Sequence, residues 1–561
     1  MGIGVILEER GLISHEQLDA AIDEQRRSGE RLDRVLVRLG FVSADDVLCA
    51  LGDQFHLPVV DLATTAVAQD VLNTLPAQLV YKQHCVPIER ENGTLTIATS
   101  DPFELTALDE LRLLTGCAIE LVLADEQEIH KFIRSHYGVG GDTLDAMNAE
   151  KGAGEIEGAG DAADEIEQAQ EASVIKLVND LLIEAIRERA TDVHIEPYEH
   201  ELTVRYRIDG VLQRANIPTT INRFASAIIS RLKIMASLNI AEKRKPQDGR
   251  ITFSSRNSDG IIEEFDLRVS VIPMLFGEGV VLRVLNKSAV LMSLDDLGMP
   301  GYVDEPWNAL IRRPHGIVLV TGPTGSGKST TLYASLNKIV SDEIKCITVE
   351  DPVEYHVPGV NQIQVNTKVG LTFSAGLRSI LRHDPDAVMV GEIRDKETAE
   401  TAVQASLTGH VVFSTLHTND AAGAVTRLID MGIEPFLIAS SVEGVLAQRL
   451  VRRVCKACGG AYEPELGDLP KDFNLRTGQT LTRGEGCREC RQTGYRGRLG
   501  IYELLTMDQP IREMIMGRIN APTIAAHAAK SGQLHTLKQD GYAKVLDGKT
   551  TISEVLRALT A

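Results

Sequence analysis

The chain has 561 residues, of which 43% are hydrophobic and 24% charged. This composition is typical of globular proteins, and the length exceeds what one hydrophobic core supports, so we expect roughly three to five domains. Acidic residues outnumber basic ones by 79 to 58, for a net charge of -21, and aromatic residues make up only 4%. Proteins that bind nucleic acids present basic and often aromatic surfaces, so we expect no nucleic-acid partner.

The sequence lacks any run of about 18 apolar residues, and its N-terminus lacks a basic segment. It therefore predicts neither a membrane span nor a signal peptide, and we expect a cytoplasmic protein. Eight cysteines fit that reducing compartment. Four of them lie in separate apolar stretches and are expected in the core: Cys49, Cys85, Cys117 and Cys346.

The first sixty residues contain an internal repeat with a constant offset of 29 residues. Gly11 aligns with Gly40, and Ser14 aligns with Ser43. Each copy predicts a short helix, a glycine turn, a serine N-cap and a second amphipathic helix. Residues 58–137 then alternate short apolar strands with helical patterns, which indicates a small α/β module.

An acidic segment rich in Gly and Ala follows, with ten acidic residues and a single basic one, Lys151, between Asp142 and Glu171. It cannot bury enough apolar surface to offset its ordering entropy, so we expect a flexible linker. Strand and helix patterns resume afterwards and alternate from about 305 to 450, which is typical of a parallel sheet covered by helices. The predicted segments are residues 1–137, 138–172, 173–290, 291–303, 304–452, 453–503 and 504–561, the last of them helical.

A phosphate-binding loop is the clearest motif. The buried-strand pattern at 316–320 leads into TGPTGSGKST, and a helical run begins at Thr331. Glycines in such a loop let backbone N–H groups surround phosphate oxygens at a helix N-terminus. We expect Lys328 on the β- and γ-phosphates of ATP and Ser329 on Mg²⁺. A glycine-rich turn without nucleotide is the alternative. The expected ATP-binding residues are Gly322, Pro323, Thr324, Gly325, Ser326, Gly327, Lys328, Ser329 and Thr330.

Two acidic strand ends offer carboxylates for the metal and the attacking water. The strand around 347–349 runs into Glu350, Asp351 and Glu354, and another ends at Glu392. Gly391 stands where nucleotide hydrolases usually place an aspartate, so we expect Glu350 and Asp351 to order Mg²⁺, with Glu354 sharing that task or helping to orient water. Glu392 is expected to activate the water. Solvated acidic strand ends are the alternative explanation.

Two histidines bracket the next apolar strand, His410 before it and His417 after it. A lone histidine is more often a satisfied core residue, and for His410 both explanations stay open. His417 lies between Thr415 and Thr418 and is expected to sense the γ-phosphate.

Two CxxC pairs, 28 residues apart, form the second strong motif. In a reducing compartment this spacing predicts a tetrahedral Cys₄ zinc site, which is structural because four thiolates leave no open position. A redox or disulfide function is the alternative. The expected zinc ligands are Cys455, Cys458, Cys487 and Cys490.

These motifs together resemble the secretion ATPases of the type II secretion and type IV pilus superfamily, and are most similar to the type II secretion ATPases known as the E component. The resemblance is carried by TVEDPVEY, QIQVN, LTFSAGLRSILRHDPDAVMVGEIRD, TGHVVFSTLHTNDA and the stretch from Arg427 to Cys455. Upstream, the segments 190–197, 205–210 and 245–250 extend it.

The resemblance implies a multidomain α/β fold, with a PAS-like domain at 173–290, a RecA-like ATPase core at 304–452 and a zinc subdomain at 453–503. It also implies a homohexamer in which ATP hydrolysis drives pseudopilus assembly and protein export. Four arginines would reach the γ-phosphate, although each could equally be a surface ion-pair partner: Arg268, Arg283, Arg378 and Arg382.

The N-terminal repeat resembles a domain that binds cyclic di-GMP in some relatives. This chain has Gly2 where arginine is usual and Asp33, beside Arg31, where glycine is usual. An acid beside a phosphate is unfavourable. The expected partners of residues 1–137 are therefore inner-membrane platform proteins, namely the cytoplasmic domain of the L component, together with the F component. They would hold the protein at the inner membrane from the cytoplasmic side.

Three other functions stay open at this point. A type IV pilus-extension or DNA-uptake motor shares the same chemistry. A regulator gated by nucleotide or cyclic di-GMP would hydrolyse little ATP. A helicase with a RecA-like core is disfavoured by the acidic composition and the scarce aromatic residues.

Overall fold

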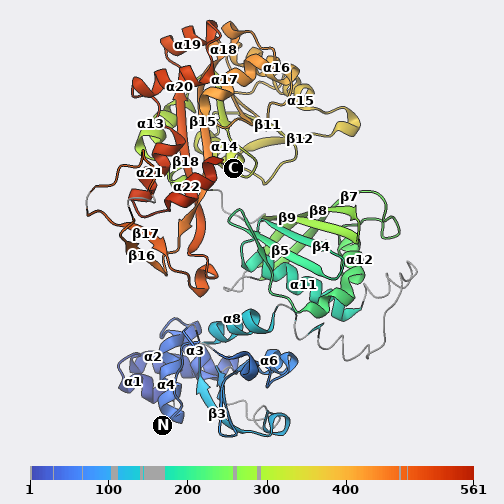
Figure 1. Ribbon diagram of the computed structural model, residues 1–561, viewed down its shortest axis with the longest axis vertical. Coiled ribbons are helices and arrows are strands. Elements are labelled where there is room, and N and C mark those ends of the chain that lie inside the picture. The colour runs from blue at the N-terminus through green and yellow to red at the C-terminus, as the bar shows by residue number, and fades with distance from the viewer. Residues whose placement is uncertain are drawn as a thin grey trace. The chain divides into compact units, whose positions relative to one another are not determined.

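A computed structural model gives the arrangement of the chain (Figure 1). It describes residues 3–29, 31–62, 64–65, 67–102, 111–138, 140, 143–144, 171–256, 262–286, 292–465, 469–476 and 478–560. The chain divides into two compact units, one of Met1–Phe253 with Asp266–Val284 and the other of Ser254–Phe265 with Leu285–Ala561. Each unit is described by itself.

The first unit opens with the predicted helical repeat. Its first copy is α1 (Ile3–Glu9) and α2 (His15–Ser28), and its second is α3 (Leu32–Arg38) and α4 (Ala44–Phe55). The hydroxyls of Ser14 and Ser43 accept the first free backbone N–H groups of α2 and α4, which fixes where these helices begin. Gly11 and Gly40 both adopt a left-handed φ of +71°, so each copy turns at the same point.

A three-stranded sheet follows the repeat. β1 (Cys85–Glu91) pairs antiparallel with β2 (Thr94–Thr99), and β2 pairs parallel with β3 (Ala118–Leu123). Apolar side chains from this sheet and its helices form one core. The predicted α/β module is therefore present. Its helices are α5 (Gln69–Leu72), α6 (Ala77–Gln83) and α8 (Glu126–Tyr137).

Three of the four scattered cysteines, Cys85, Cys117 and Cys346, are buried as predicted. Cys49 is exposed, so its assignment to the core was wrong. α4 buries Val47 together with the Ala50–Gly52 segment, and Cys49 lies on the opposite face of that helix. Apolar neighbours in the sequence do not determine which helix face a residue occupies.

The rest of the first unit is a six-stranded sheet with the strand order β6-β5-β4-β9-β8-β7. β4 pairs antiparallel with both β5 and β9. Alternate residues of β8 are buried, as expected for a sheet with one face on a core. Its elements are α11 (Ala172–Arg187), β4 (Asp192–Pro197), β5 (Leu202–Ile208), β6 (Val211–Arg214), a 3₁₀ turn (Thr219–Phe224), α12 (Ala225–Met235), β7 (Gln247–Arg256), β8 (Ile262–Met274) and β9 (Gly277–Asn286).

The second unit is built on a seven-stranded sheet with the order β12-β11-β13-β14-β10-β15-β18. The strands from β12 to β15 are parallel, and β18 adds antiparallel to β15. β10 (Gly316–Thr321) lies inside the sheet between β14 and β15, and all six of its residues are buried. Two apolar clusters contain buried residues of the sheet and of its helices. The alternation predicted for this region is confirmed.

Figure 1 shows the helices that accompany this sheet, coloured from yellow-green to red. The strands are β11 (Cys346–Glu350), β12 (Val360–Gln364), β13 (Ala387–Val390), β14 (Val411–Leu416), β15 (Val442–Val454), β16 (Gly459–Tyr462), β17 (Leu481–Gly484) and β18 (Tyr495–Thr506). The helices are α13 (Gly301–Leu310), α14 (Lys328–Ile339), α15 (Phe373–Ile380), α16 (Lys396–Leu407), α17 (Ala421–Asp430), α18 (Pro435–Ser441), α19 (Gln509–Met516), α20 (Ala521–Lys530), α21 (Leu537–Leu546) and α22 (Ile552–Thr560). Short 3₁₀ turns span Asp295–Leu297, Thr367–Val369 and Arg488–Cys490.

Buried carboxylates fasten the C-terminal helices to the sheet. Glu503 on β18 accepts the backbone N–H of Ala421, where α17 begins, and that of Leu537, where α21 begins. A carboxylate at a helix N-terminus satisfies donors that the helix itself leaves unpaired. The helical tail is therefore anchored through β18.

The predicted acidic linker, residues 138–172, lies largely outside the described residues. Among the helices that the structure does describe, none is both long enough and apolar enough to cross a membrane.

Candidate active site

The loop between β10 and α14 has the backbone that its glycines require. Gly322, Gly325 and Gly327 have φ values of +146°, +78° and +89°, a region that side chains disfavour. A Cβ atom at Gly322 would overlap the backbone carbonyl oxygen of Gln448. The loop is thus packed closely against β15, and α14 begins directly after it at Lys328.

Lys328 is only 9% exposed and its ammonium group folds back over the loop. Its Nζ donates to the carbonyl oxygens of Gly322 and Pro323, both at 2.9 Å. Burial lowers the pKa of Lys328 to about 8, and the positive charge of Arg449 acts in the same direction, while Glu392 and Glu354 oppose the shift. The lysine therefore sits in a pocket that disfavours an uncompensated positive charge.

The loop residue Ser326 supplies a test of whether a phosphate fits here. Its Oγ is buried and lacks a hydrogen-bond partner within the part of the chain that is described. Buried hydroxyls are normally paired, so an acceptor is expected at this point. Ser329 and Thr330 occupy the first turn of α14, the N-terminal end that favours anions and the metal they carry. The residues present fit Mg²⁺ and a polyphosphate.

Glu392 lies two residues beyond β13 and faces an imidazole and a guanidinium group. Its Oε2 is 3.4 Å from Nε2 of His417, which follows β14 directly, and its Oε1 pairs with the guanidinium of Arg394. Burial lowers the pKa of His417, with Lys328 acting in the same direction and Glu392 opposing it. The parallel sheet brings these residues together because consecutive carboxyl ends share one edge.

The three acidic residues at the end of β11 and after it differ in burial. Glu350 is only 4% exposed, and it accepts hydrogen bonds from Thr348 Oγ1 at 2.6 Å, Gln362 Nε2 at 3.1 Å and the hydroxyl of Tyr333. Asp351 and Glu354 are exposed. Glu350 would have to exchange these donors to reach a metal ion.

The contacts of His410 favour a structural role over a role in catalysis. Its Nδ1 lies 3.0 Å from the carbonyl oxygen of Ala405 and 3.2 Å from the hydroxyl of Thr408. These contacts close the end of α16 before β14 begins.

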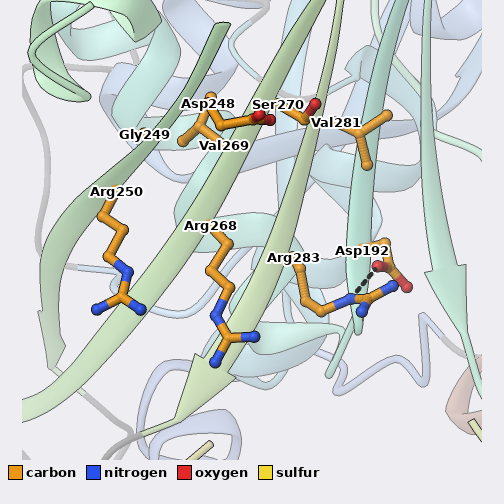
Figure 2. A pocket seen from close by; sticks show the side chains of 9 residues that line it. All are labelled: Asp192, Asp248, Gly249, Arg250, Arg268, Val269, Ser270, Val281 and Arg283. Atoms are coloured by element: carbon orange, nitrogen blue, oxygen red, sulfur yellow. Dashed lines mark hydrogen bonds and ion pairs between the residues drawn. The ribbon is translucent and has the colours of Figure 1, made fainter. Parts of the chain in front are cut away.

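The arginines Arg268 and Arg283 lie in the first unit, on β8 and β9. Figure 2 shows them with Arg250 of β7 along a pocket of about 490 Å³, with the three guanidinium groups at the same end. Arg283 is paired there with Asp192, Nε to Oδ1 at 3.0 Å. Carried by neighbouring strands, these cations form one row.

The other two arginines are on α15 and just after it. Arg378 Nη1 donates to Glu397 Oε1 at 2.6 Å, and Arg382 Nη1 donates to the carbonyl oxygen of Arg378 at 2.9 Å. Both side chains lie at exposed positions. Within the described chain, neither arginine pairs with Glu392.

The four clustered cysteines meet between β15 and β18. All four sulfur atoms lie within 4.8 Å of one another. Measured Sγ–Sγ distances are 3.8 Å for Cys455 and Cys487, and 3.7 Å for both Cys458–Cys490 and Cys487–Cys490. Four thiolates about 2.3 Å from a tetrahedral zinc ion have nearly this spacing. Burial raises the pKa of Cys490, but hydrogen bonds from the backbone N–H groups of Cys487 and Gly494 and from the thiols of Cys487 and Cys458 together lower it to about 7, while burial raises the pKa of Cys458.

The N-terminal repeat places Arg31 between two acids. Arg31 Nε and Nη2 donate to Asp33 at 3.1 and 2.8 Å, and its Nη1 donates to Asp101 at 2.6 Å. The carboxylates thus occupy the guanidinium that a cyclic dinucleotide phosphate would need. This ion-pair geometry does not favour cyclic di-GMP at the second copy.

Sequence reasoning missed Gln448 and Arg449 on β15. Gln448 Oε1 accepts the hydroxyl of Thr331 on α14 at 2.6 Å, and Arg449 Nη2 donates to Asn419 Oδ1 at 2.9 Å. The signal was two long polar residues in the middle of the otherwise apolar run 444–451. Polar residues inside an apolar strand sequence indicate that this part of the strand contacts polar groups, here those around the phosphate-binding loop.

Two family models match the chain. One, described as Type II/IV secretion system protein, matches residues 167–557, and one described as MshEN domain matches residues 55–143. The second match falls on the α/β module and the residues that follow it, after the helical repeat.

Full-length relatives point the same way. The type IV pilus assembly ATPase PilB of Myxococcus xanthus is 42% identical over 562 residues, covering 99% of this chain and 98% of that protein. Type II secretion system protein E of Pseudomonas aeruginosa is 48% identical over 469 residues, covering 82% of this chain and 91% of that protein. The X-ray structure of the Legionella pneumophila ATPase DotB shares the fold, with a TM-score of 0.50, 21% identity and coverage of 68% and 95%.

Proposed function

This chain belongs to the type II/IV secretion system protein family, and from that premise we propose that it is the ATPase that powers a type II secretion system. It is an ATP-hydrolysing motor of the secretion and pilus superfamily. The observation that carries the proposal is the loop of Gly322 to Ser329 with the Glu392–His417 pair beside it.

The loop residues bind the triphosphate and its metal ion in the proposed hydrolysis. Lys328 exchanges its two loop carbonyls for the β- and γ-phosphate oxygens, and the loop N–H groups and Ser326 complete the cradle. Ser329 would hold Mg²⁺ together with Asp351 and Glu350, and the bound metal would neutralise phosphate charge. The loop thus binds and orients the triphosphate.

Glu392 accepts a proton from the attacking water in this mechanism, with Glu354 helping to orient that water. His417, 3.4 Å from Glu392, senses whether the γ-phosphate is present. His417 and Glu392 follow the neighbouring strands β14 and β13. Loss of the γ-phosphate would therefore remove a contact at the carboxyl ends of both strands at once.

The domain arrangement is part of the proposal. Residues 173–290 form a PAS-like domain, 291–303 a connector, 304–452 a RecA-like core, 453–503 a zinc subdomain and 504–561 a helical region, in a homohexamer. We assign Arg268, Arg283, Arg378 and Arg382 to the γ-phosphate, which the cationic row of Figure 2 supports for the first pair. Zn²⁺ held by the four cysteines fixes the turn between β15 and β18.

We assign residues 1–137 to docking, with 138–172 as the linker. The proposed partners are platform proteins of the inner membrane, the cytoplasmic domain of the L component and the F component, which place the motor at the cytoplasmic face. The ion pairs of Arg31 support docking over cyclic di-GMP binding at this domain.

Lys328→Ala tests the proposal directly. We expect phosphate release from ATP to fall by at least about a hundredfold, because the variant loses the cation on the transferred phosphate. Lys338→Ala, on the exposed side of the same helix, is the matched control and should keep full turnover. Turnover of Lys328→Ala equal to that of the wild type would refute the assignment.

Pilus extension is the second candidate, favoured by the match to PilB over nearly the whole chain. The chemistry is the same and the partners differ. Co-purification of the full chain with platform proteins of a secretion system or of a pilus system separates the two.

A further inference from the structure

Arg449 on β15 is a buried cation without an acidic partner among the described residues. It is 4% exposed, Nη2 donates to Asn419 Oδ1 at 2.9 Å, and neither Nε nor Nη1 has a hydrogen-bond partner within the described ranges. Asn419 is neutral, so the positive charge of the guanidinium is not compensated. A buried charge of this kind is costly unless something pairs with it.

The position of Arg449 shows what could pair with it. Strand β10 lies between β14 and β15, and Asn419 follows β14. The hydrogen bond from Arg449 to Asn419 therefore spans the carboxyl end of β10, which is where the loop begins. The positive charge of Arg449 also acts on Lys328, so the guanidinium lies within electrostatic range of the phosphate-binding lysine.

Arg449 also holds the segment that carries His417. Residues of three strands fasten residues 417–421. Thr321 of β10 hydrogen-bonds with the hydroxyl of Thr418 and accepts its backbone N–H at 2.9 Å, Arg449 of β15 binds Asn419, and Glu503 of β18 accepts the backbone N–H of Ala421. Of these contacts, only the one with Asn419 involves a side chain whose positive charge has no acidic partner in the described chain, that of Arg449. Its loss would loosen the segment next to Glu392.

We propose that Arg449 is a positioning residue of the phosphate site, which fixes the His417 segment and supplies a buried positive charge that a bound nucleotide polyphosphate compensates. The proposal rests on the proposed ATPase function. It differs from a purely structural explanation, in which Arg449 only joins β15 to the end of β14.

The charge and the positioning contact are separable by substitution. In Arg449→Gln both are lost, and we expect ATP binding to weaken about tenfold and kcat to fall as well. In Arg449→Lys the charge is kept and the geometry toward Asn419 is lost, so ATP affinity should stay within about threefold of the wild type while kcat falls. Asn419→Ala keeps the charge and should lower kcat alone.

Arg452→Gln serves as the matched control. Arg452 is on the same strand and is paired with Glu554, so its loss should lower the melting temperature without changing ATP affinity. Hydrogen exchange of residues 417–421 gives a readout independent of activity. Exchange should be faster in Arg449→Gln and Asn419→Ala than in the wild type and Arg452→Gln.

Titration of the full chain with ATP, followed by turnover at saturating ATP, decides between the outcomes. Equal ATP affinity in Arg449→Gln and wild type would overturn the role of the charge, as would equal losses in the Gln and Lys variants. If Arg449→Gln fails to fold, Arg449→Met, which removes the charge and keeps the apolar stem, tests the role of the charge, and Asn419→Ala tests the positioning contact. A wild type that binds ATP but never releases phosphate would refute the proposed function while leaving the affinity comparison readable.

Discussion

Two regions of the second unit bury charge in opposite ways. In the helical edge, which we define as β18, α19–α22 and the zinc turn, Glu503 and Glu554 accept hydrogen bonds from several donors each. In the phosphate region, residues 322–329 with Glu392, His417 and Arg449, the Oγ of Ser326 and two nitrogens of Arg449 have no partner in the described chain. In the helical edge the hydrogen-bonded carboxylates hold the fold, whereas the unpartnered polar groups of the phosphate region lie where we propose that the nucleotide binds.

Glu392→Gln is the change with the largest expected effect. The amide keeps the size of the side chain but cannot accept a proton, so kcat should fall about a thousandfold, which corresponds to about 4 kcal/mol of activation free energy. The melting temperature should change little, because Glu392 is only an ion-pair partner of exposed groups. Phosphate release and thermal unfolding measure the two effects.

Glu400→Gln is the control for that change, since Glu400 forms an exposed ion pair with Lys396 on α16 and belongs to no part of the proposed site. Turnover in Glu392→Gln comparable to this control would show that the phosphate region does not use Glu392 as a base.

Removal of the zinc site tests the other region. Cys487→Ser with Cys490→Ser should abolish zinc binding and destabilise the unit by on the order of 3 kcal/mol, because metal binding and local folding are coupled. ATP affinity below the unfolding transition should be kept. Zinc content per chain, melting temperature and ATP titration form the test, and the replacement Cys117→Ser, at a buried cysteine of the first unit, shows the effect of losing an ordinary core thiol.

Glu554→Gln extends the test to a carboxylate of the helical edge. Burial opposes ionisation, but hydrogen bonds from Arg452 and Arg557 outweigh it and lower the pKa of Glu554 to about 2, from an ordinary 4.5. We expect a loss of about 2 kcal/mol in unfolding free energy at neutral pH, less than for a fully buried pair because Arg557 is partly exposed.

The pH dependence of Glu554→Gln follows from the lowered pKa. A depressed carboxyl pKa stabilises the fold above about pH 4.5, and this stabilisation is lost as the pH falls toward 2. The difference in stability between wild type and Glu554→Gln should therefore be full at pH 6 and shrink below pH 4. A difference that persists unchanged at pH 2 would contradict the ionic explanation.

Local features of the fold were predictable from the sequence alone. The serine caps and glycine turns of the repeat, and the strand, loop and helix around Lys328, each depend on neighbours within a few residues. That Glu392 and His417 lie at the same edge of the sheet was also predictable, since parallel strands bring their carboxyl ends to one edge, but their direct contact depends on β13 and β14 being neighbours.

Contacts set by tertiary packing were not predictable. Arg449 reaches Asn419 only because the sheet order puts β10 between β14 and β15, and the sequence does not state that order. The exposure of Cys49 depends on which face of α4 packs inward. Glu350 and Glu392 look alike in the sequence, each an acid at the end of an apolar strand, yet their surroundings differ.

Glu350→Gln is the change with the smallest expected effect. It is also the sharpest test of the difference between the helical edge and the phosphate region. Glu350 lies at the edge of the phosphate region, but its hydrogen bonds from Tyr333, Thr348 and Gln362 resemble those of the helical edge. Glutamine keeps one carbonyl acceptor and the hydroxyls of Tyr333 and Thr348 can reorient, so we expect a loss of about 1 kcal/mol in stability.

If Glu350 acts only through this network, kcat should fall less than about tenfold, and the Mg²⁺ concentration for half-maximal turnover should not move. If Glu350 also orders Mg²⁺, that concentration should rise and excess Mg²⁺ should restore turnover. Asp351→Asn provides the comparison, because Asp351 is exposed and lacks the network of Glu350. A shift in Mg²⁺ dependence for Asp351→Asn but not for Glu350→Gln would assign the metal to the exposed acid and place Glu350 with the structural carboxylates.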